Sequence, residues 1–296
     1  MAWRLQCRRP RRRPVSRDLP RGRARDPRGA RRGRAQDRSA GAPVAAARGG
    51  PAAAFATGAV RAPLTRLGLP KLWHEDRKRL WRFARHTVVP VTLRLAPTAA
   101  YGVDRIPRDR GCVLAANHFS GIDHPLIGAF VPGITYFLAK SELFEIPVLG
   151  EALAWMGVIS IRRGESDRDA LRLAREHVRN GDVVCVHIEG TRQRLGYPGP
   201  IQSGGLMIAM QEGAPVVPLG LDTFGWSPRN RRACALVFGE PIALDHLPRN
   251  RRGYEEAGAL VRQEMVRLWR LAAEAAAAGL PPELPDGTLR NGPVSD

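Results

Sequence analysis

The stretch of sequence that decides the fold is CVLAANHFSGIDHP at residues 112–125. Its first five residues are apolar, which predicts a buried strand. A polar loop follows, and Pro125 predicts that a helix begins just after Asp123, because proline is favoured in the first turn of a helix. A strand that passes through a short loop into a helix is a building unit of an α/β sheet.

Segments of the same two kinds alternate along the rest of the chain. Strands are also predicted at 134–139, 158–161, 183–187, 215–221 and 233–238, and helices at 125–131, 147–156, 167–180, 206–212 and 254–278. The helix at 167–180 has a candidate capping box in Ser166 and Asp169, and Gly181 is suited to end it. This order of elements predicts an α/β sheet with helices on its faces.

Most of the positive charge lies near the N-terminus. The formal net charge is +19, but residues 1–70 contain 18 Arg and 3 Asp, so the rest of the chain carries only +4. Residues 1–66 are rich in Arg, Pro, Gly and Ala without apolar periodicity, which predicts a disordered tail. The alternative is an upstream extension of the reading frame, which Arg-rich coding favours. In either case the extreme charge belongs to the tail and not to the folded body.

An amphipathic helix is predicted ahead of the folded domain. From Pro70 to Val89 apolar residues recur at three- and four-residue steps, and Pro90 is expected to end or kink the helix. Trp73 and Trp81 beside basic residues fit a membrane interface, and they fit equally a helix that packs on the domain's own core. The chain has no uncharged apolar run long enough to cross a bilayer.

These patterns divide the chain into four parts. They are the tail at 1–66, a membrane-associating helical segment at 67–98, a folded domain at 99–280, and a flexible Pro-rich tail at 281–296. The four cysteines are isolated in sequence, and none stands at a spacing typical of disulfides or metal ligands. We therefore predict no disulfide framework and no metal site, and a reducing cytosol fits this cysteine usage best.

His118 and Asp123 are the first candidates for chemistry. On one continuous helix their spacing would place them about 140° apart, so they meet only if the chain turns between them, which Gly121 permits. Asp123 at the positive end of a helix would accept one ring N–H of His118 and leave the other ring nitrogen as a base. The alternative is that Asp123 only caps the helix and His118 is a core histidine.

A second candidate site follows the predicted strand at 183–187. In open α/β sheets, ligands bind at the carboxyl ends of the strands, and here that end leads into Glu189-Gly190-Thr191-Arg192. Gly190 lets backbone N–H groups approach an anion, Thr191 offers a hydroxyl, and Arg192 offers a two-pronged donor. Together they predict a phosphate site, whereas the alternative is a surface turn with a solvated arginine.

Two further strands add to this edge of the sheet. The strand at 158–161 ends in Arg162 and Arg163, which bring two cations. The strand at 215–221 contains Pro215 and Pro218, and two prolines in an interior strand indicate a local bend.

The order and spacing of these blocks resemble the glycerophospholipid acyltransferases of the 1-acylglycerol-3-phosphate acyltransferase type. The resemblance runs from about Tyr101 to Ile242. It rests on Asn117, His118 and Asp123 in the first block, Glu189 to Arg192 in the third, and Pro215 and Pro218 in the fourth, with Ser203-Gly204 and residues 238–241 in support. It implies the mixed sheet flanked by helices of that family, with the amphipathic helix ahead of an acyltransferase domain at 99–280.

The sequence departs from the family pattern at three places. Arg162 stands where the second block usually has an acid, and His187-Ile188 stand where Phe-Pro commonly precedes the third block. Gln202 stands where a basic residue often precedes the Ser-Gly pair. All three surround the predicted phosphate site, so they leave the identity of the acyl acceptor open.

The resemblance implies direct acyl transfer. His118 would remove a proton from a glycerol hydroxyl as that oxygen attacks an acyl thioester, and Asp123 would stabilise the imidazolium. Arg163, Thr191 and Arg192 would hold the acceptor phosphate, Glu189 would orient a basic side chain or the acceptor hydroxyl, and Asn117 and Gly190 complete the expected substrate-binding set. No metal, cofactor or covalent intermediate is required, and a nucleophilic Ser120 is a disfavoured alternative.

The implied function is acylation of lysophosphatidic acid to phosphatidic acid in phospholipid biosynthesis. The co-substrate would be acyl-CoA or an acyl carrier protein thioester, and the protein would lie peripherally on the cytoplasmic face of the cell membrane. One alternative keeps this chemistry on another lysolipid or on glycerol 3-phosphate. Another is a nucleic-acid-binding protein using the Arg-rich tail, which is disfavoured because the tail lacks aromatic residues interleaved to stack on bases. No specific nucleic-acid partner is therefore expected.

Overall fold

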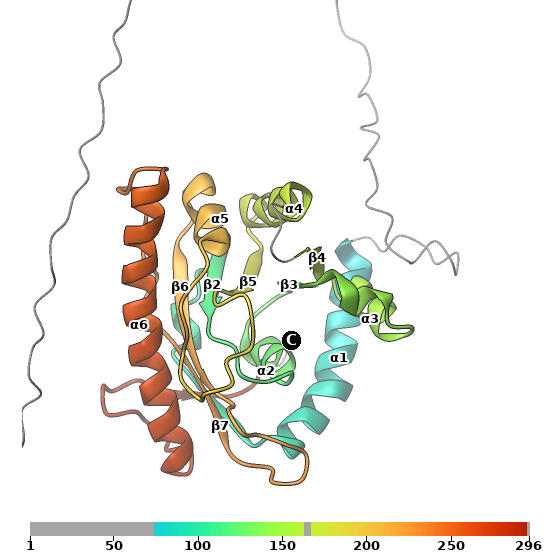
Figure 1. Cartoon of the computed structure of the whole chain (residues 1–296). Helices are drawn as coiled ribbons and strands as arrows, with labels where there is room; N and C mark the ends of the chain where they lie inside the picture. Colours follow the sequence, from blue (N-terminus) through green and yellow to red (C-terminus); the bar gives the residue numbers. More distant parts are fainter. Residues whose placement is uncertain (1–73, 163–166, 295–296) are drawn as a thin grey trace, which may run out of the picture. The chain divides into compact units, whose positions relative to one another are not determined.

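The computed structural model describes residues 74–162 and 167–294 (Figure 1). Four sequence predictions lie outside these residues: the tail at 1–66, Trp73 of the amphipathic helix, Arg163 of the acceptor site, and Ser166 of the capping box. Within the described residues, helices and strands alternate in the predicted order.

A mixed sheet of 8 strands forms the centre of the described part of the chain. The strands are β1 (Thr98–Tyr101), β2 (Cys112–Ala116), β3 (Thr135–Lys140), β4 (Ile159–Ile161), β5 (Val183–His187), β6 (Val216–Asp222), β7 (Cys234–Phe238) and β8 (Arg290–Asn291). Their order across the sheet is β4-β3-β5-β2-β6-β7-β1-β8. The strands from β4 to β6 are parallel, whereas β7 is antiparallel to β6 and β8 is antiparallel to β1. The predicted fold class, an α/β mixed sheet flanked by helices, is confirmed.

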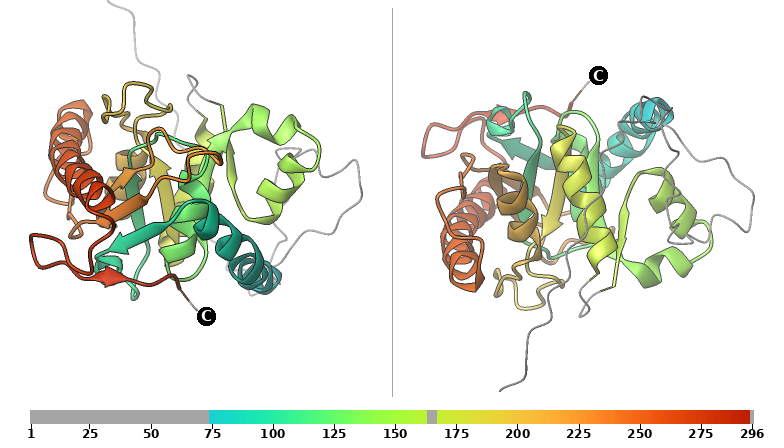
Figure 2. Two further views of the ribbon diagram at one scale, coloured as in Figure 1. Left: turned by 90° about the horizontal axis from the view of Figure 1, so that it is seen from below. Right: turned by 90° about the horizontal axis from the view of Figure 1, so that it is seen from above.

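Helices cover both faces of this sheet. They are α1 (His74–Leu95), α2 (Asp123–Phe130), α3 (Leu149–Trp155), α4 (Arg168–Arg179), α5 (Gly204–Glu212) and α6 (Arg251–Ala277), with short 3₁₀ helices η2 (Val103–Arg105) and η3 (Ser141–Glu145). The helices α4, α5 and α6 lie side by side on one face, and α1 packs with α2 on the other (Figure 2). The right-handed rule for parallel crossovers accounts for this division, because β2-α2-β3 and β4-α4-β5 run across the sheet in opposite directions.

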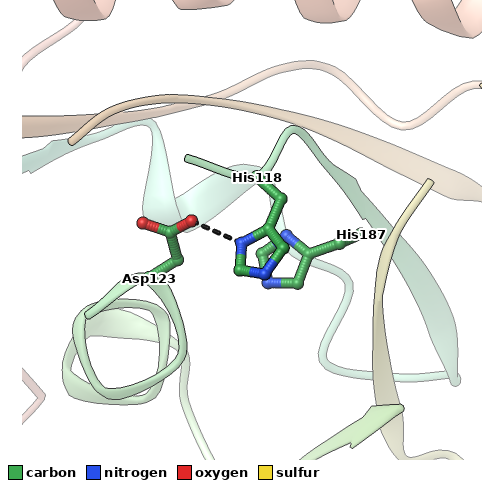
Figure 3. Close-up of side chains that lie close together, drawn as sticks. All are labelled: His118, Asp123 and His187. Atoms are coloured by element: carbon green, nitrogen blue, oxygen red, sulfur yellow. Dashed lines mark hydrogen bonds and ion pairs between the residues drawn. The ribbon is translucent and has the colours of Figure 1, made fainter. Parts of the chain in front are cut away.

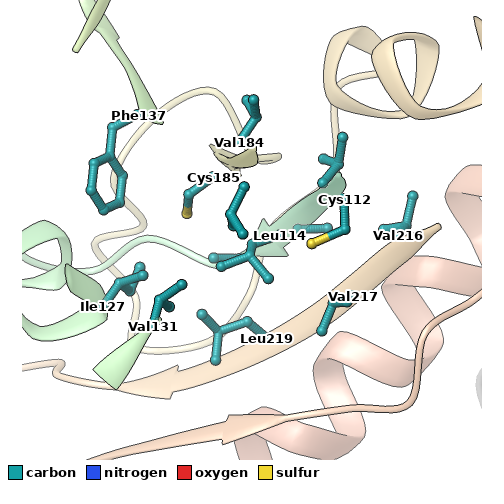
Figure 4. Close-up of a cluster of buried hydrophobic side chains, with 14 of the residues drawn as sticks. Cys112, Leu114, Ile127, Val131, Phe137, Val184, Cys185, Val216, Val217 and Leu219 are labelled. Carbon is teal, nitrogen blue, oxygen red and sulfur yellow. The ribbon is translucent and has the colours of Figure 1, made fainter. Parts of the chain in front are cut away.

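The core fills the space between β2 and the helices. Leu114 of β2, Ile127 of α2 and Leu219 of β6 are fully buried and meet in one cluster (Figure 4). Burying one such side chain stabilises the fold by about 1.5–3 kcal/mol. Three cysteines (Cys112, Cys185 and Cys234) are buried free thiols, and burial raises the pKa of the Cys112 thiol to about 12. These thiols are therefore neutral core residues.

Helix α4 begins one residue later than predicted. Its N-cap is Asp167, whose side chain accepts a hydrogen bond from the amide of Ala170 at 3.1 Å. The predicted capping box with Asp169 was therefore wrong, because an aspartate directly before the helix satisfies the free amide. Gly181 follows the helix with a φ of 89°, the left-handed conformation expected where a helix ends.

Helix α1 differs from the prediction in length and in its contacts. It continues through Pro90 to Leu95, because Val89 and Leu93 pack on the core on both sides of the proline. Trp81 is 5% exposed, and its indole N–H donates to the carbonyl of Met156 at 3.3 Å. The membrane-interface role was therefore wrong for Trp81, which packs on the domain's own core.

The C-terminal segment also differs from the prediction. Residues 281–294 of the predicted flexible tail fold back, and β8 pairs with β1. Arg290 donates its amide to the carbonyl of Pro282 at 2.8 Å, and Val294 donates to Ala129 at 3.0 Å. The strand β1 was missed because four residues are too few to display a period. The sheet edge formed by β1 supplies the partner that orders the C-terminal segment.

Candidate active site

His118 and Asp123 lie together at the carboxyl end of β2, as predicted (Figure 3). The Nδ1 of His118 is 2.7 Å from Oδ2 of Asp123, and both side chains are almost fully buried. The chain turns between them, and Asp123 is the first residue of α2. The bond to Asp123 occupies Nδ1, so the other ring nitrogen of His118 is the one that remains for the predicted role as a base.

Four donors converge on the carboxylate of Asp123. Oδ2 accepts the amides of Phe119 at 2.9 Å and Ser120 at 3.0 Å in addition to His118. Oδ1 accepts the hydroxyl of Thr223 at 2.5 Å, which comes from the loop after β6. An acceptor-only group with four donors is a carboxylate, and these contacts fix its position relative to the imidazole.

Gly121 serves the site in a different way from the one predicted. It has no positive φ, so the turn itself does not require glycine. A Cβ added at this residue would lie 3.3 Å from a guanidinium nitrogen of Arg192. The missing side chain therefore makes room for Arg192, which reaches over the loop between His118 and Asp123.

Asn117, which is predicted to bind substrate, has a structural position in the fold. Its side chain is fully buried, and both ends of its amide are occupied by the backbone of Leu221. Nδ2 donates to the Leu221 carbonyl at 2.9 Å, and Oδ1 accepts the Leu221 amide at 2.7 Å. The contacts tie the start of the His118 loop to β6, so Asn117 acts on the site by holding its backbone.

Glu189 is predicted to orient a basic side chain or the acceptor hydroxyl. In the structure its carboxyl group contacts two backbone amides. Oε2 accepts the amide of His118 at 2.7 Å, and Oε1 accepts the amide of Gly199 at 2.6 Å. Burial raises the pKa of Glu189 to about 7, against the opposing effect of these two amide donors. Glu189 therefore joins the loop of His118 to the loop that precedes α5.

The turn at residues 189–192 has fewer groups available for binding a ligand than predicted. Gly190 has a φ of 71°, and its amide donates to the carbonyl of His187 at 3.0 Å. That amide closes the turn, and the substrate-binding role of Gly190 stays a prediction. Thr191 and Arg192 are exposed, and the amide of Gln193 donates to the His118 carbonyl at 2.8 Å. The turn is thus attached to His118 while two of its side chains face outward.

The second block contributes Arg162 at the end of β4. Its amide donates to Oδ2 of Asp167 at 3.0 Å, and its side chain forms an ion pair with the same carboxylate at 3.7 Å. Arg162 therefore connects β4 to the start of α4. The role predicted for Arg163 stays a prediction.

His187 is the site residue that the sequence reasoning missed. It is the last residue of β5, and its ring lies parallel to that of His118 with the centroids 4.0 Å apart (Figure 3). His124 approaches both rings edge-on, at 5.4 Å from His118 and 4.7 Å from His187. The sequence did not reveal this contact, because it depends on the register in which β2 and β5 pair, with Ala116 opposite His187. Side chains just beyond two paired strand ends must lie close together.

The side chains of His118, Asp123 and His187 are also close enough together to be ligands of one metal ion. Their ligand atoms lie within 4.8 Å of one another. A metal binds an imidazole nitrogen in the plane of the ring, and here the two ring planes are 18° apart and their centroids are separated by 4.0 Å. Stacked rings of this kind do not place one ion in both ring planes, whereas the contact of one ring with a carboxylate suits a base.

The family match covers the same part of the chain. Residues 98–222 match the family model described as Acyltransferase. The chain carries an acyltransferase-family domain. The matched residues contain His118, Asp123 and the turn at 189–192, so the candidate site lies inside the acyltransferase domain.

Individual relatives agree with this assignment. The chain is 37% identical over 156 residues to a chloroplastic 1-acyl-sn-glycerol-3-phosphate acyltransferase of Brassica napus, a match that covers 51% of this chain and 44% of the relative. It is 23% identical over 179 residues to the 1-acyl-sn-glycerol-3-phosphate acyltransferase of Bacillus subtilis, covering 58% of this chain and 89% of the relative. The match thus spans less than half the length of the plant protein.

A solved structure supports the fold of the acyltransferase domain. The crystal structure of the 1-acyl-sn-glycerophosphate (LPA) acyltransferase PlsC from Thermotoga maritima aligns with a TM-score of 0.55 and 26% sequence identity. The alignment covers 72% of this chain and 87% of that chain.

Proposed function

We propose that this protein is an O-acyltransferase that moves a fatty acyl group from a thioester to the free hydroxyl of 1-acylglycerol 3-phosphate. The observation that carries the proposal is the buried pair of His118 Nδ1 and Asp123 Oδ2, 2.7 Å apart, at the carboxyl end of β2. The names of the relatives from Brassica napus and Bacillus subtilis support the choice of acceptor. A lysolipid of another headgroup and glycerol 3-phosphate are the alternative acceptors.

The proposed reaction is a direct transfer. The second ring nitrogen of His118 takes the proton of the acceptor hydroxyl while that oxygen attacks the thioester carbonyl carbon. The C–S bond breaks, and the proton passes from the imidazolium to the leaving thiolate, which gives an ester and a free thiol. General-base assistance of this kind accelerates a reaction by about 10²- to 10⁴-fold. Asp123 stabilises the imidazolium that forms between the two proton transfers.

The proposed chemistry uses no metal and no cofactor beyond the thioester. Either acyl-CoA or an acyl carrier protein thioester supplies the same carbonyl carbon. The assay that tests the function combines the purified protein, a labelled acyl-CoA and a panel of acceptors in the presence of a metal chelator. Formation of labelled phosphatidic acid from lysophosphatidic acid supports the proposal, whereas transfer that requires added metal contradicts the mechanism.

Arg192 is the described side chain best placed to hold the acceptor phosphate. It is exposed and lies against Gly121 beside the His118 loop. We expect Arg192→Ala to raise the KM for a phosphate-bearing acceptor about 10- to 100-fold, because one charge-assisted hydrogen bond is worth about 1.5–3 kcal/mol. The KM for acyl-CoA should change less than twofold. Steady-state kinetics with each substrate varied in turn measure both constants.

Arg194→Ala is the matched control, since Arg194 is an exposed arginine two residues further along the same segment. It should leave both constants close to wild type. An Arg192→Ala variant that alters only the acyl-CoA constant would assign Arg192 to the thioester and not to the acceptor.

We also propose that the domain works at a membrane surface. Among the described residues, no helix combines the length and the apolarity that crossing a bilayer requires. Exposed apolar side chains are instead present on α1 and around α3; they are Phe83, Val88, Val91, Ile146, Val148 and Leu149. Exposed Lys78, Arg79 and Arg82 on α1 add positive charge, which favours a surface containing anionic lipid. The cytoplasmic face of the cell membrane is the location that this proposal implies.

One double substitution on α1 tests the proposed contact with the membrane surface. Phe83→Glu with Val91→Glu should release the protein from vesicles that contain anionic phospholipid, because each change places a charge at the lipid interface. The control is Leu289→Glu, since Leu289 is 64% exposed, as is Phe83, but lies outside α1 and α3. Co-sedimentation measures the bound fraction. Equal binding of the double variant and the control would place the membrane contact elsewhere.

A further inference from the structure

His187 lies against the face of the predicted base. The planes of the His187 and His118 rings are 18° apart, and their centroids are separated by 4.0 Å (Figure 3). Nδ1 of His187 is 2.8 Å from the carbonyl oxygen of Asn117. A carbonyl only accepts, so Nδ1 of His187 carries the hydrogen and donates it. The His187 ring is therefore fixed by the backbone of the residue that precedes His118.

The two histidines are held by a continuous set of contacts. Asn117 is bound through its side chain to Leu221 of β6, and His118 is bound through its ring to Asp123 of α2. His187 itself ends β5. Three separate elements thus converge on the two stacked rings, and His187 covers one face of the His118 ring.

A carboxylate and a third histidine lie next to the stacked rings. The carboxylate of Asp123 bonds to His118, and His124 approaches both rings edge-on. Three other titratable or charged groups border the site. They are Glu189, whose carboxyl binds the His118 amide, Cys185, whose thiol pKa is raised by burial, and Arg192, which lies against Gly121.

We propose that His187 is a positioning residue, an aromatic surface that holds the plane of the His118 ring for proton transfer. The proposal rests on the proposed function for its kinetic consequence. Its structural content, one ring stacked on the other, is independent of which acceptor is acylated.

Three variants separate the ring of His187 from its hydrogen bond. His187→Ala should lower kcat about 10- to 100-fold with both KM values within twofold of wild type, because misplacing a reacting group by about 1 Å has an effect of this size. His187→Phe keeps a flat ring and should restore kcat to within about threefold of wild type. His187→Asn keeps a donor for the Asn117 carbonyl but has no ring, so it should resemble the alanine variant. A rescue by Asn and not by Phe would overturn the proposal.

A measurement that needs no activity tests the stacking of the two rings. In protein with isotope-labelled histidine, nuclear magnetic resonance should show the His118 ring signals shifted by the ring current of His187. His187→Ala should remove this shift, and His187→Phe should keep a shift of similar size. His118 ring signals that are unchanged in His187→Ala would overturn the proposal.

The two measurements fail in distinguishable ways. If the wild-type protein transfers no acyl group to any acceptor, the proposed function fails, and the resonance measurement still decides whether His187 is stacked on His118. If transfer occurs and His187→Ala leaves kcat unchanged, the positioning role fails and the function stands. Thermal melts of each variant establish that its fold is intact, and His246→Phe, at an exposed histidine outside the site, controls for the substitution itself.

Discussion

Replacing His118 with alanine is expected to abolish acyl transfer and to leave the fold intact. In the proposed mechanism the substitution removes the ring nitrogen that takes the proton of the acceptor hydroxyl, and general-base assistance contributes about 10²- to 10⁴-fold to a rate. The sheet does not depend on this ring, because the backbone of His118 is held by Glu189 and Gln193. Single-turnover measurement of acyl transfer with saturating substrates gives the effect on the chemical step.

The control for this prediction is His246→Ala, at an exposed histidine in the loop after β7. It should leave the rate unchanged. Purified His118→Ala protein with a wild-type thermal melt and a wild-type rate would show that another group is the base.

Asp123→Asn is expected to have the second large effect. The amide can place its oxygen toward the amides of Phe119 and Ser120 and its nitrogen toward the hydroxyl of Thr223, so the fold should tolerate it. The negative charge beside His118 is lost, and with it the stabilisation of the imidazolium. The same exchange in the catalytic triad of serine proteases lowers kcat about 10⁴-fold. We expect a loss approaching this size in kcat, with smaller changes in KM.

A second substitution separates charge from geometry at Asp123. Thr223→Val removes the donor to Oδ1 and leaves the carboxylate charged, so the expected loss in kcat is only about 10-fold, near the net value of one hydrogen bond. If Thr223→Val were as damaging as Asp123→Asn, the position of the carboxylate and not its charge would be the main contribution.

Secondary structure was predictable where a segment is long or strongly apolar. The strands β2 and β5 have the predicted bounds, because each is a short apolar run between polar turns. The strand β1 and the pairing of β8 were not predictable, since four and two residues carry no period and their partners lie far away in sequence. Helix α1 passes Pro90 because its contacts with the core outweigh the local effect of proline, which a sequence pattern does not record.

In the candidate site, too, some features were predictable from the sequence and others were not. The His118 and Asp123 pair was predictable from a five-residue spacing that contains a turn, because local geometry alone brings the two side chains together. Asn117 and Glu189 were predicted as ligand-binding residues, and the structure places both against backbone amides and carbonyls. Sequence identifies such residues as special but does not reveal whether their partner is a substrate or the protein itself.

The sequence by itself determined the alternation of strands and helices, the basic N-terminal composition and the adjacency of His118 to Asp123, because each follows from residues close together in the chain. Only the tertiary structure decided the burial of Trp81, the contact of Arg192 with Gly121 and the stacking of His187 on His118. Those depend on the register of β2 against β5 and on the packing of α1 against α2. The physical reason is that contacts between distant segments are chosen by the packing of the whole core, which no local pattern encodes.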